Sequence, residues 1–396
     1  MRPRPPPPLG FALLASLAES LTNFRGPLIE LLQERGFRVS ACAPPTSLAV
    51  RAQLERAGVE FTAVELRRNR LGVLGDLAYA ARLYAWLRRT RPQFVLAYTA
   101  KPVIYGLLAA RAAGVPVRSA LITGLGYALT GESLGRRALR WLLIRLHRVA
   151  LRKAACVMFQ NPDDQAFFAA RAIVPAGVPT AVMNGSGVDL RRFQPCALPG
   201  APTFLLIARL LRDKGIGEYA AAARLVKAQY PQARFRLAGW HDTNPEAIEA
   251  AALQGWIAAG LIEYLGPLED VRPALAECRI YVLPSYREGT PRTVLEAMAM
   301  GRPVITTDVP GCRETVQPEV NGLLVPAREA APLAAAMIRM IADPELAERC
   351  GREGLRIARE KYDARRVSTA MLAAMGMDRI ATSSHVGGRR HGELPD

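Results

Sequence analysis

The sequence predicts an α/β protein built from two doubly wound parallel-sheet domains. Its 396 residues, half of them hydrophobic, are enough for two cores of ordinary size. Short apolar runs alternate with amphipathic helical segments, which is the rhythm of a parallel sheet covered by helices on both faces. That rhythm stops in a polar stretch with Gly and Pro near residues 184–202 and then begins again. Two Rossmann-like halves joined by a linker are therefore expected.

The expected elements follow one another along each half. In the first half, strands are expected at 11–15, 38–42 and 94–98, and helices at 24–35, 47–57 and 103–113. In the second half, strands are expected at 204–208, 235–238, 281–283 and 304–307, and helices at 217–229 and 291–300. Ligands of such sheets bind beyond the carboxyl ends of the strands. The loops that follow strands, in a cleft between the halves, are therefore the expected site.

Changes in composition set the expected domain boundaries. The regions are a Pro-rich flexible lead-in at 1–8, a first domain at 9–183, a linker at 184–201, a second domain at 202–360, a helix at 361–380 that crosses back to the first domain, and a tail at 381–396. The tail is polar, rich in Gly and without periodicity, so we expect it to be disordered. No stretch approaches the roughly 20 uncharged apolar residues of a spanning helix, so a soluble or peripheral protein is expected.

The chain is strongly basic, with 52 Lys and Arg against 35 Asp and Glu and a formal charge of +17. Such a charge attracts a polyanion, which could be nucleic acid, an anionic membrane or a phosphorylated substrate. No nucleic-acid recognition motif occurs, so nucleic acid is not an expected partner. The six cysteines form no CxxC pair, and HExxH and Asp-x-Asp motifs do not occur, so no metal is proposed. Reduced cysteines in a cytoplasmic protein are expected.

The segment from Ser285 to Val316 carries the strongest functional signal. Thr290 is suited to the N-cap of its helix, Pro291 to the first helical position and Gly301 to the position after its end. Because the helix follows a strand, its free amides and positive dipole end project toward the expected site. That end of the helix can hold an anion such as a diphosphate.

Four charged side chains of the second half indicate a sugar nucleotide as ligand. Glu288 precedes the helix and Glu296 lies inside it, and carboxylates accept hydrogen bonds from the hydroxyls of a hexose or a ribose. Arg209 and Lys214 follow the first strand of this half, where two cations can neutralise a leaving diphosphate. The alternative is that Glu288 is an ordinary loop charge and Glu296 a solvated helix residue. Arg209 and Lys214 would then be ordinary surface cations.

The run Leu-Pro-Ser-Tyr-Arg-Glu-Gly-Thr-Pro, with the later Glu-Ala-Met-Ala-Met-Gly-Arg-Pro-Val, closely resembles glycosyltransferase family 4. The resemblance implies a retaining glycosyltransferase with the GT-B fold. It implies a nucleotide-sugar donor, expected to be UDP-linked, and transfer without a metal or other cofactor. Arg209 and Lys214 resemble the phosphate clamp of the family, and Glu288 takes the place of the glutamate that contacts the transferred sugar. These three residues are the expected catalytic group.

The same resemblance assigns the rest of the donor site. Glu296 takes the place of the glutamate that contacts the ribose of the nucleotide. The amides of Gly289 and Thr290 are expected near the sugar and phosphates. Arg292 is counted with them as a donor-binding residue.

The first half is expected to bind the acceptor. Asn23, Arg25 and Gly26, placed at the start of the first helix, would turn backbone amides toward the site, although a plain helix cap explains them equally well. This segment resembles the N-terminal loop of glycosyltransferase family 4. Acceptor or phosphate contacts are therefore expected here.

Two further segments of the first half, 98–106 and 121–127, resemble a subgroup that adds sugars to polyprenyl-diphosphate-linked intermediates. Many members have a histidine near position 99 to 101, and this chain has none there. We therefore assign no catalytic histidine and expect Lys101 to contact a phosphate or the acceptor. Thr123 and Gly124 are assigned to the same side of the site.

The stretch 134–153 is expected to be a basic amphipathic helix. Arg136, Arg137, Arg140, His147 and Arg148 fall on one arc, with Trp141 near its boundary and the apolar residues Ala138, Leu139, Leu142, Leu146 and Val149 opposite. Such a helix is typical of a membrane-surface element. An ordinary helix packing its Leu stripe on the sheet remains the alternative.

The sequence thus predicts a cytoplasmic enzyme that associates peripherally with the anionic inner membrane. Its expected partners are a nucleotide sugar and a lipid-linked saccharide acceptor, to which it adds a hexose or N-acetylhexosamine. Two rivals stay open at this point. One is a GT-B-like UDP-sugar 2-epimerase, and the other is a non-enzymatic basic protein that binds membranes or nucleic acid.

Overall fold

A computed structural model describes residues 8–66, 72–125, 134–241 and 246–378, without the side chains of 73 and 134–137. The expected tail at 381–396, most of the lead-in and the Gly126 to Tyr127 part of an expected acceptor loop lie outside these residues. The chain divides into two compact units. Unit 1 comprises Met1–Phe159, Gln165–Met183 and Ser368–Asp396, and unit 2 comprises Gln160–Asp164 and Asn184–Val367.

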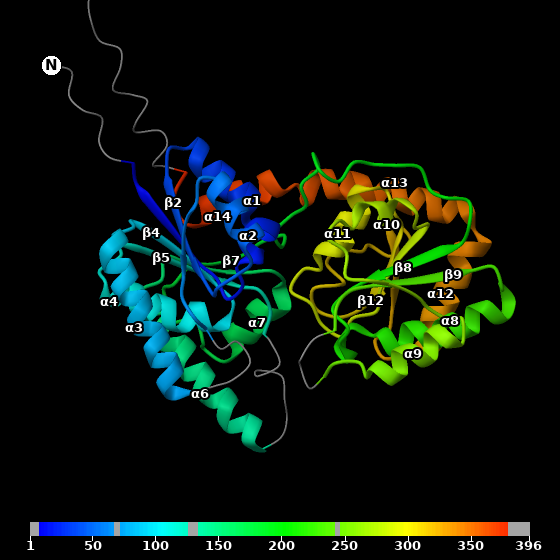
Figure 1. Cartoon of the computed structure of the whole chain (residues 1–396), viewed down its shortest axis with the longest axis horizontal. Coiled ribbons are helices and arrows are strands. Elements are labelled where there is room, and N and C mark those ends of the chain that lie inside the picture. The colour runs from blue at the N-terminus through cyan, green and yellow to red at the C-terminus, as the bar shows by residue number, and fades with distance from the viewer. Residues whose placement is uncertain (1–7, 67–71, 126–133, 242–245, 379–396) are drawn as a thin grey trace, which may run out of the picture. The chain divides into compact units, whose positions relative to one another are not determined.

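Unit 1 contains a seven-stranded parallel sheet in the order β3-β2-β1-β4-β5-β6-β7 (Figure 1). Its strands are β1 (Gly10–Leu14), β2 (Arg38–Ala43), β3 (Glu60–Ala63), β4 (Phe94–Tyr98), β5 (Val117–Ile122), β6 (Cys156–Phe159) and β7 (Thr180–Val182). The helices that begin between these strands are α1 (Glu19–Glu34), α2 (Leu48–Arg56), α3 (Val73–Thr90), the π-helical turn η1 (Pro102–Gly106), α4 (Leu107–Ala112), α6 (Leu134–Ala150) and α7 (Pro162–Ala170). Helices α3, α4 and α6 cover one face of the sheet, and α1 and α2 cover the other (Figure 1).

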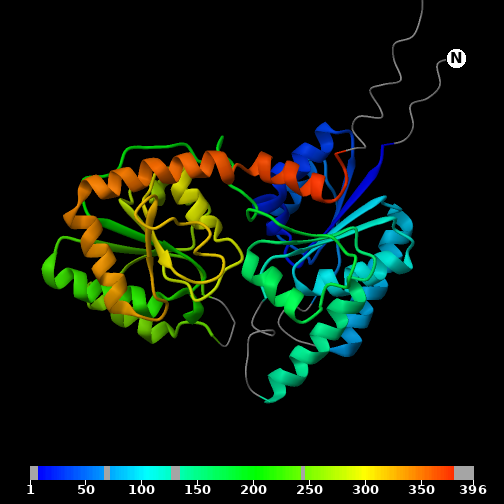
Figure 2. The same cartoon turned by 180° about the vertical axis from the view of Figure 1, so that it is seen from behind.

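Unit 2 repeats this plan with a six-stranded parallel sheet in the order β10-β9-β8-β11-β12-β13. Its strands are β8 (Thr203–Ile207), β9 (Arg234–Ala238), β10 (Glu263–Gly266), β11 (Ile280–Leu283), β12 (Val304–Thr307) and β13 (Gly322–Val325). Its helices are the 3-10 turn η2 (Arg212–Lys214), α8 (Ile216–Gln229), α9 (Ala250–Ala258), α10 (Arg272–Ala276), α11 (Arg292–Ala299), α12 (Ala330–Ala342) and α13 (Pro344–Lys361). Helix α14 (Ala364–Ala374) follows, and its residues from Ser368 onward belong to unit 1. Helices α8 and α12 pack on one face, and α10 and α11 on the other (Figure 2).

The prediction of two doubly wound parallel sheets is confirmed. In each unit the order of strands reverses beside the first strand, between β4 and β1 in unit 1 and between β11 and β8 in unit 2. At such a reversal the connections leave in opposite directions, which opens a crevice at the carboxyl ends of the two strands. The loops after β8 and β11, which carry the charged residues singled out from the sequence, therefore lie at the same edge of the sheet.

Most expected strands and helices lie within two residues of the observed ones. The first helix begins at Glu19 instead of 24, and Pro27 lies inside it. Thr290 is not the N-cap of α11, because its hydroxyl donates to the carbonyl of Gln160 at 2.9 Å and Pro291 occupies the cap position. Gly301 follows the helix with a φ of 80°, as expected.

All six cysteines lie in the described part of the chain and are unpaired, five of them buried and Cys196 exposed. Among the described residues, we find no helix with the length and apolar character needed to cross a bilayer.

Gly215, between η2 and α8, is required by both its backbone angle and its neighbours. Its φ is 67°, and a Cβ added there would come within 2.1 Å of the carbonyl oxygen of Pro284. We expect Gly215→Ala to lower the free energy of unfolding of unit 2 by ~2 kcal/mol or more, from backbone strain and the clash together. Urea denaturation followed by circular dichroism measures this change.

Gly217 gives a matched control in the same helix. A Cβ there meets nothing within 4 Å, so Gly217→Ala should leave stability unchanged or raise it by up to about 1 kcal/mol. Equal unfolding midpoints for the two variants would contradict the role assigned to Gly215.

Candidate active site

The site of unit 2 is centred on an ion pair between the loops that follow β8 and β11. The ammonium nitrogen of Lys214 lies 2.5 Å from Oε1 of Glu288. The hydroxyl of Ser285 donates to the same oxygen at 2.7 Å. Only 13% of the Lys214 side chain and 18% of the Glu288 side chain are exposed, so both charges are held largely away from solvent. Such a pair has a fixed geometry, which is what a catalytic contact needs.

The local fold explains why these two residues meet. Lys214 ends the η2 turn after β8, and Gly215 then turns the chain into α8. Glu288 follows β11, the neighbour of β8 in the sheet. Burial lowers the pKa of Lys214, but the carboxylates of Glu288 and Asp213 raise it by more, so Lys214 is held in its charged form.

Arg209 belongs to the same charge cluster. It lies half-buried in the loop after β8, and its positive charge opposes that of Lys214, lowering the pKa of the lysine. Two cations that repel each other at the carboxyl edge of a sheet gain from an anion placed between them. The structure thus places Arg209, Lys214 and Glu288 in one charge cluster, and their contacts with a donor stay a prediction.

Glu296 is a buried carboxylate, which rules out the solvated helix residue considered from the sequence. It lies on α11 and is 6% exposed. Burial raises its pKa above the ordinary 4.5, although the positive charges of Arg292 and Arg192 oppose that shift. Nε of Arg292 is 2.8 Å from its carboxylate, and Asp270 adds a repulsive charge. A carboxylate desolvated at such a place is typical of a ligand-binding group.

Two residues beside these glutamates were not found from the sequence. Arg192 lies in the expected linker at 184–201, and its charge acts on Glu296. Gly311, in the loop after β12, has a φ of 87°, and a Cβ there would lie 2.3 Å from the carbonyl oxygen of Glu288. The positive φ could not be read from the sequence, but the Pro310-Gly311 pair shortly after β12 is a turn signal that marks the position.

The loop from Arg287 to Thr290 also rests on residues 160–164, which belong to unit 2. Asn161 donates from Nδ2 to the carbonyl oxygens of Gly289 at 3.0 Å and Glu288 at 3.3 Å. Arg287 pairs with the fully buried carboxylate of Asp164. No motif in the sequence indicated this support, because it comes from a segment far from the loop along the chain.

In unit 1 the residues assigned to the start of the first helix lie inside α1. The amides of Asn23 and Gly26 are therefore not at a helix start, and that part of the prediction is wrong because the helix begins at Glu19. Asn23 is exposed and Gly26 half-buried. Arg25 is 2% exposed, and its guanidinium lies 4.8 Å from the ring centroid of Tyr98, which ends β4.

Lys101 has an acidic partner that the sequence did not indicate. Its ammonium nitrogen is 2.6 Å from Oδ1 of Asp76 on α3, and the hydroxyl of Tyr105 donates to Oδ2 at 3.1 Å. Burial, and then the charge of Asp76, raises the pKa of Tyr105 to about 12. Just before this cluster, Thr99 has a φ of 69°, a strained conformation for a β-branched residue. A phosphate contact by Lys101 stays a prediction.

Thr123 and Gly124 follow β5 and are half-buried. Lys101 after β4 and these two residues after β5 therefore lie at the carboxyl edge of the unit 1 sheet.

Helix α6 presents a different face from the expected one. His147 is buried at 2% exposure, and burial lowers its pKa to about 4, so it does not belong to a charged arc. Leu143 and Ala150 are buried with it, whereas Trp141, Leu142 and Val149 are exposed. The buried stripe thus runs through 143, 147 and 150, so the apolar arc expected from Leu142 and Val149 is wrong.

The basic residues of α6 differ in their contacts. Arg140 is half-buried, and Arg145 places its guanidinium 4.6 Å from the ring centroid of the exposed Trp141. Arg148 donates to the carbonyls of Arg171 and Ala172 at 2.9 and 2.8 Å, so it anchors a turn of unit 1. The side chains of Arg136 and Arg137 lie outside the described part of the structure.

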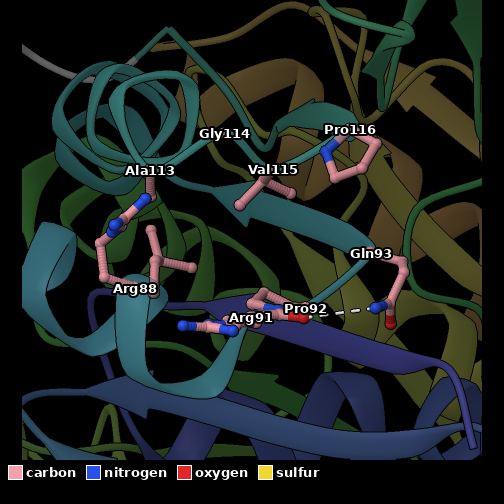
Figure 3. Close-up of a pocket in the computed structure, with 9 residues that line it drawn as sticks. Arg88, Arg91, Pro92, Gln93, Ala113, Gly114, Val115 and Pro116 are labelled. Atoms are coloured by element: carbon pink, nitrogen blue, oxygen red, sulfur yellow. Dashed lines mark hydrogen bonds between the residues drawn. The ribbon is translucent and has the colours of Figure 1, made fainter.

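A surface pocket of about 230 Å³ in unit 1 lies at the amino ends of β4 and β5 (Figure 3). It is lined by residues that precede β4 and β5, among them Arg91, Gln93 and Pro116, and Gln93 donates to the carbonyl of Arg91 at 3.4 Å. This pocket is separate from the carboxyl-end loops. Within the described ranges, no three or more His, Cys, Asp or Glu residues group in a way that could hold a metal ion.

Two protein-family models match the chain, one for each half. Residues 24–185 match the glycosyl transferase 4-like domain, and residues 201–343 match the glycosyl transferases group 1. The second match contains the Arg209, Lys214, Glu288 and Glu296 positions.

Two curated relatives align with most of the chain. The N,N'-diacetylbacillosaminyl-diphospho-undecaprenol alpha-1,3-N-acetylgalactosaminyltransferase of Campylobacter jejuni is 28% identical, over 85% of this chain and 90% of that protein. The UDP-Gal:alpha-D-GlcNAc-diphosphoundecaprenol alpha-1,3-galactosyltransferase of Escherichia coli is 24% identical, over 72% of this chain and 76% of that protein. Both names describe sugar transfer.

Solved structures support the same fold. The sucrose-phosphate synthase of Thermosynechococcus elongatus has a TM-score of 0.76 at 22% identity and covers 95% of this chain and 100% of its own. The Anabaena protein HepE, in complex with UDP and glucose, has a TM-score of 0.73 at 18% identity and covers 92% of this chain and 99% of its own. With two doubly wound sheets and a family match in each half, the chain belongs to the family 4 type of glycosyltransferases and has their GT-B fold.

Proposed function

We propose that the protein moves a hexose or N-acetylhexosamine from a UDP-sugar to a polyprenyl-diphosphate-linked saccharide, with retention of the anomeric configuration. The observation that carries this proposal is the cluster of Arg209, Lys214 and Glu288 at the strand reversal of unit 2. The two relatives described above are named for transfer to undecaprenol-diphosphate-linked sugars, which supports the choice of acceptor. That acceptor belongs to the synthesis of surface polysaccharides and glycan precursors.

The donor half of the reaction follows from the charges in unit 2. Lys214 and Arg209 bind the diphosphate and neutralise the charge that builds up as it leaves. Glu288, oriented by Lys214 and Ser285, accepts hydrogen bonds from the sugar hydroxyls. Glu296 accepts from the ribose hydroxyls. Because two side-chain cations take the charge of the diphosphate, the proposal includes transfer without a metal.

The chemistry on this view needs no protein base. The leaving phosphate oxygen takes the proton of the acceptor hydroxyl on the same face of the sugar from which the new bond forms. The protein contributes orientation of the two substrates and electrostatic stabilisation of the departing diphosphate. A retained configuration is the expected product of such a reaction on one face.

The proposal also places acceptor binding at the cytoplasmic surface of a membrane, which helix α6 would contact. Helix α6 exposes Trp141, Leu142 and Val149 next to Arg140 and Arg145. Exposed apolar residues beside arginines suit the boundary between anionic headgroups and acyl chains. A formal charge of +17 adds a general attraction to an anionic leaflet.

Purified protein should transfer sugar from one of UDP-glucose, UDP-galactose, UDP-GlcNAc or UDP-GalNAc to an undecaprenyl-diphosphate-linked saccharide. Glu288→Ala and Lys214→Ala should each lower turnover ~100-fold, the scale lost when one preorganised group is removed from a transition state. Mass spectrometry of the lipid product gives the rate, and NMR gives the anomeric configuration.

Glu319→Ala is the matched control, because it breaks an exposed ion pair of unit 2 with Arg339. It should leave turnover near that of the wild type. Release of free sugar and UDP without an acceptor would indicate a hydrolase or epimerase, and normal turnover in the Glu288 variant would reject the assigned role.

Glu296→Gln should stabilise unit 2 while weakening donor binding. The pKa of Glu296 in the folded protein is raised above the ordinary 4.5, so the native state binds this proton more tightly than the unfolded state. The stability contribution is therefore complete below about pH 4.5 and is lost as pH rises through the folded-state pKa. The free energy of unfolding of the variant, minus that of the wild type, should grow across this window. UDP affinity should fall about tenfold, because a neutral amide is a weaker acceptor than a carboxylate.

Urea denaturation between pH 4 and pH 8, with calorimetric UDP titration at pH 7.5, measures both effects. Glu348→Gln, an exposed change on α13, provides the control. A stability difference that does not change with pH would contradict the buried, ionising carboxylate.

Arg140→Gln with Arg145→Gln should weaken binding to vesicles that contain phosphatidylglycerol. Each arginine near an anionic surface contributes about 1 kcal/mol, so the double variant should bind roughly 30-fold less tightly. Vesicle flotation measures the bound fraction. Arg148 is left unchanged because it anchors a turn.

The double variant Arg51→Gln with Arg56→Gln on α2 has the same loss of charge. It should float like the wild type. Equal flotation of the two double variants would mean that α6 only packs on its sheet.

A further inference from the structure

The carbonyl groups of the loop before α11 are tied to one side chain. Asn161 is fully buried, and its Nδ2 donates to the carbonyl oxygens of Glu288 at 3.3 Å and Gly289 at 3.0 Å. The same nitrogen lies 3.2 Å from Oδ2 of Asp164, so its two hydrogens are shared among three acceptors, while Oδ1 accepts from the backbone N–H of Asp164 at 2.8 Å. One carboxamide therefore caps the start of α7 and holds two consecutive peptide groups of the donor loop.

The neighbours of Asn161 hold the two ends of the same loop. The carboxylate of Asp164, itself fully buried, pairs with Arg287. The carbonyl of Gln160 accepts from the hydroxyl of Thr290 at 2.9 Å. The loop is thus fixed at its first residue, at its last residue and at both peptides between them.

Because the peptide bond is planar, fixing the two carbonyl groups also fixes the direction of the N–H groups that follow them. In a trans peptide the carbonyl and the following N–H point in opposite directions. Because the carbonyls of Glu288 and Gly289 both point toward Asn161, the N–H groups of Gly289 and Thr290 both point away from it. Gly311 closes the carbonyl side, since a Cβ there would lie 2.3 and 2.6 Å from these two oxygens.

The two N–H groups are available for a ligand. Gly289 and Thr290 are half-buried, and no acceptor among the described residues takes a hydrogen bond from either N–H. Two parallel N–H dipoles beside Lys214 and Glu288 suit an anion.

We propose that Asn161 is a positioning residue that aims the N–H groups of Gly289 and Thr290 at the diphosphate of the donor. The inference depends on the proposed donor site, because the diphosphate is the anion that these groups receive. Without Asn161 the two peptides can rotate, and their dipoles no longer meet the charge that develops on the leaving group. Misplacement of a binding group by about 1 Å can cost roughly 100-fold in rate.

Asn161→Asp and Asn161→Ser separate this role from helix capping. Both side chains keep an oxygen that can accept from the N–H of Asp164, because Asp and Ser are good N-caps. Neither reproduces the carboxamide that bridges the two loop carbonyls. The serine variant carries no added charge, so it remains informative if the aspartate variant fails to fold. Ser47→Ala is the control, because it removes an N-cap from α2 in unit 1.

Calorimetric titration of the full-length protein with UDP and with UMP gives the ratio of the two affinities. A loss of stability alone would leave this ratio unchanged. We expect both Asn161 variants to bind UDP about 10-fold more weakly and UMP within about twofold of the wild type, because the second phosphate is the group that the N–H pair holds. Their kcat for transfer should fall roughly 10- to 100-fold. Ser47→Ala, which loses a helix cap away from the donor loop, should keep the wild-type ratio of UDP to UMP affinity.

A ratio of UDP to UMP affinity equal to that of the wild type in both variants would overturn the inference. A wild-type protein that binds UDP but transfers no sugar would reject the proposed function alone, and the affinity ratio would still decide the role of Asn161. A wild type that binds none of UDP, GDP, ADP or dTDP would overturn both.

Discussion

The contact between Lys214 and Glu288 is the constraint on which the donor site depends. Burying either charge without its partner would cost several kcal/mol of desolvation free energy, so each side chain needs the other to stay charged at this place. They can do so because β8 and β11 are neighbours in the sheet and Gly215 lets the chain turn sharply after the lysine. The pair then fixes the relative position of two loops that are far apart in sequence. A sugar nucleotide would enter a site whose charges are already ordered, which lowers the entropy lost on binding.

The strands and the donor motif could be read from the sequence because both rest on local patterns. Buried parallel strands are short apolar runs, and the loop around Glu288 carries a distinctive order of residue types. The partner of Glu288 could not be read in the same way. Lys214 is 74 residues away, and its resemblance to a phosphate clamp with Arg209 gives no sign that it pairs with the glutamate. Long-range pairs of this kind follow from strand order, which no local pattern encodes.

The wrong expectations have a similar origin. The first helix was expected to begin at residue 24, with Asn23, Arg25 and Gly26 at its start, whereas α1 begins one turn earlier at Glu19 and contains Pro27. On α6 the expected apolar arc included Leu142 and Val149, which are exposed, and left out Leu143, which is buried. The buried stripe instead includes His147, which packs edge-on to Phe168 with 5.8 Å between ring centroids. A neutral, buried histidine fills such a space as an aromatic residue does, so hydrophobicity alone did not identify the buried face.

The five residues from Gln160 to Asp164 limit how the protein can be divided. They belong to unit 2, yet the strand before them and the rest of the helix after them belong to unit 1. A fragment that starts at residue 184 would keep the whole glutamate motif and both cations, and would still lack the carboxamide and the carboxylate on which the donor loop rests. Residues 184–367 therefore contain all the motif residues but not every residue that packs in unit 2. A chimaera that exchanges the second halves of related enzymes would also have to exchange residues 160–164.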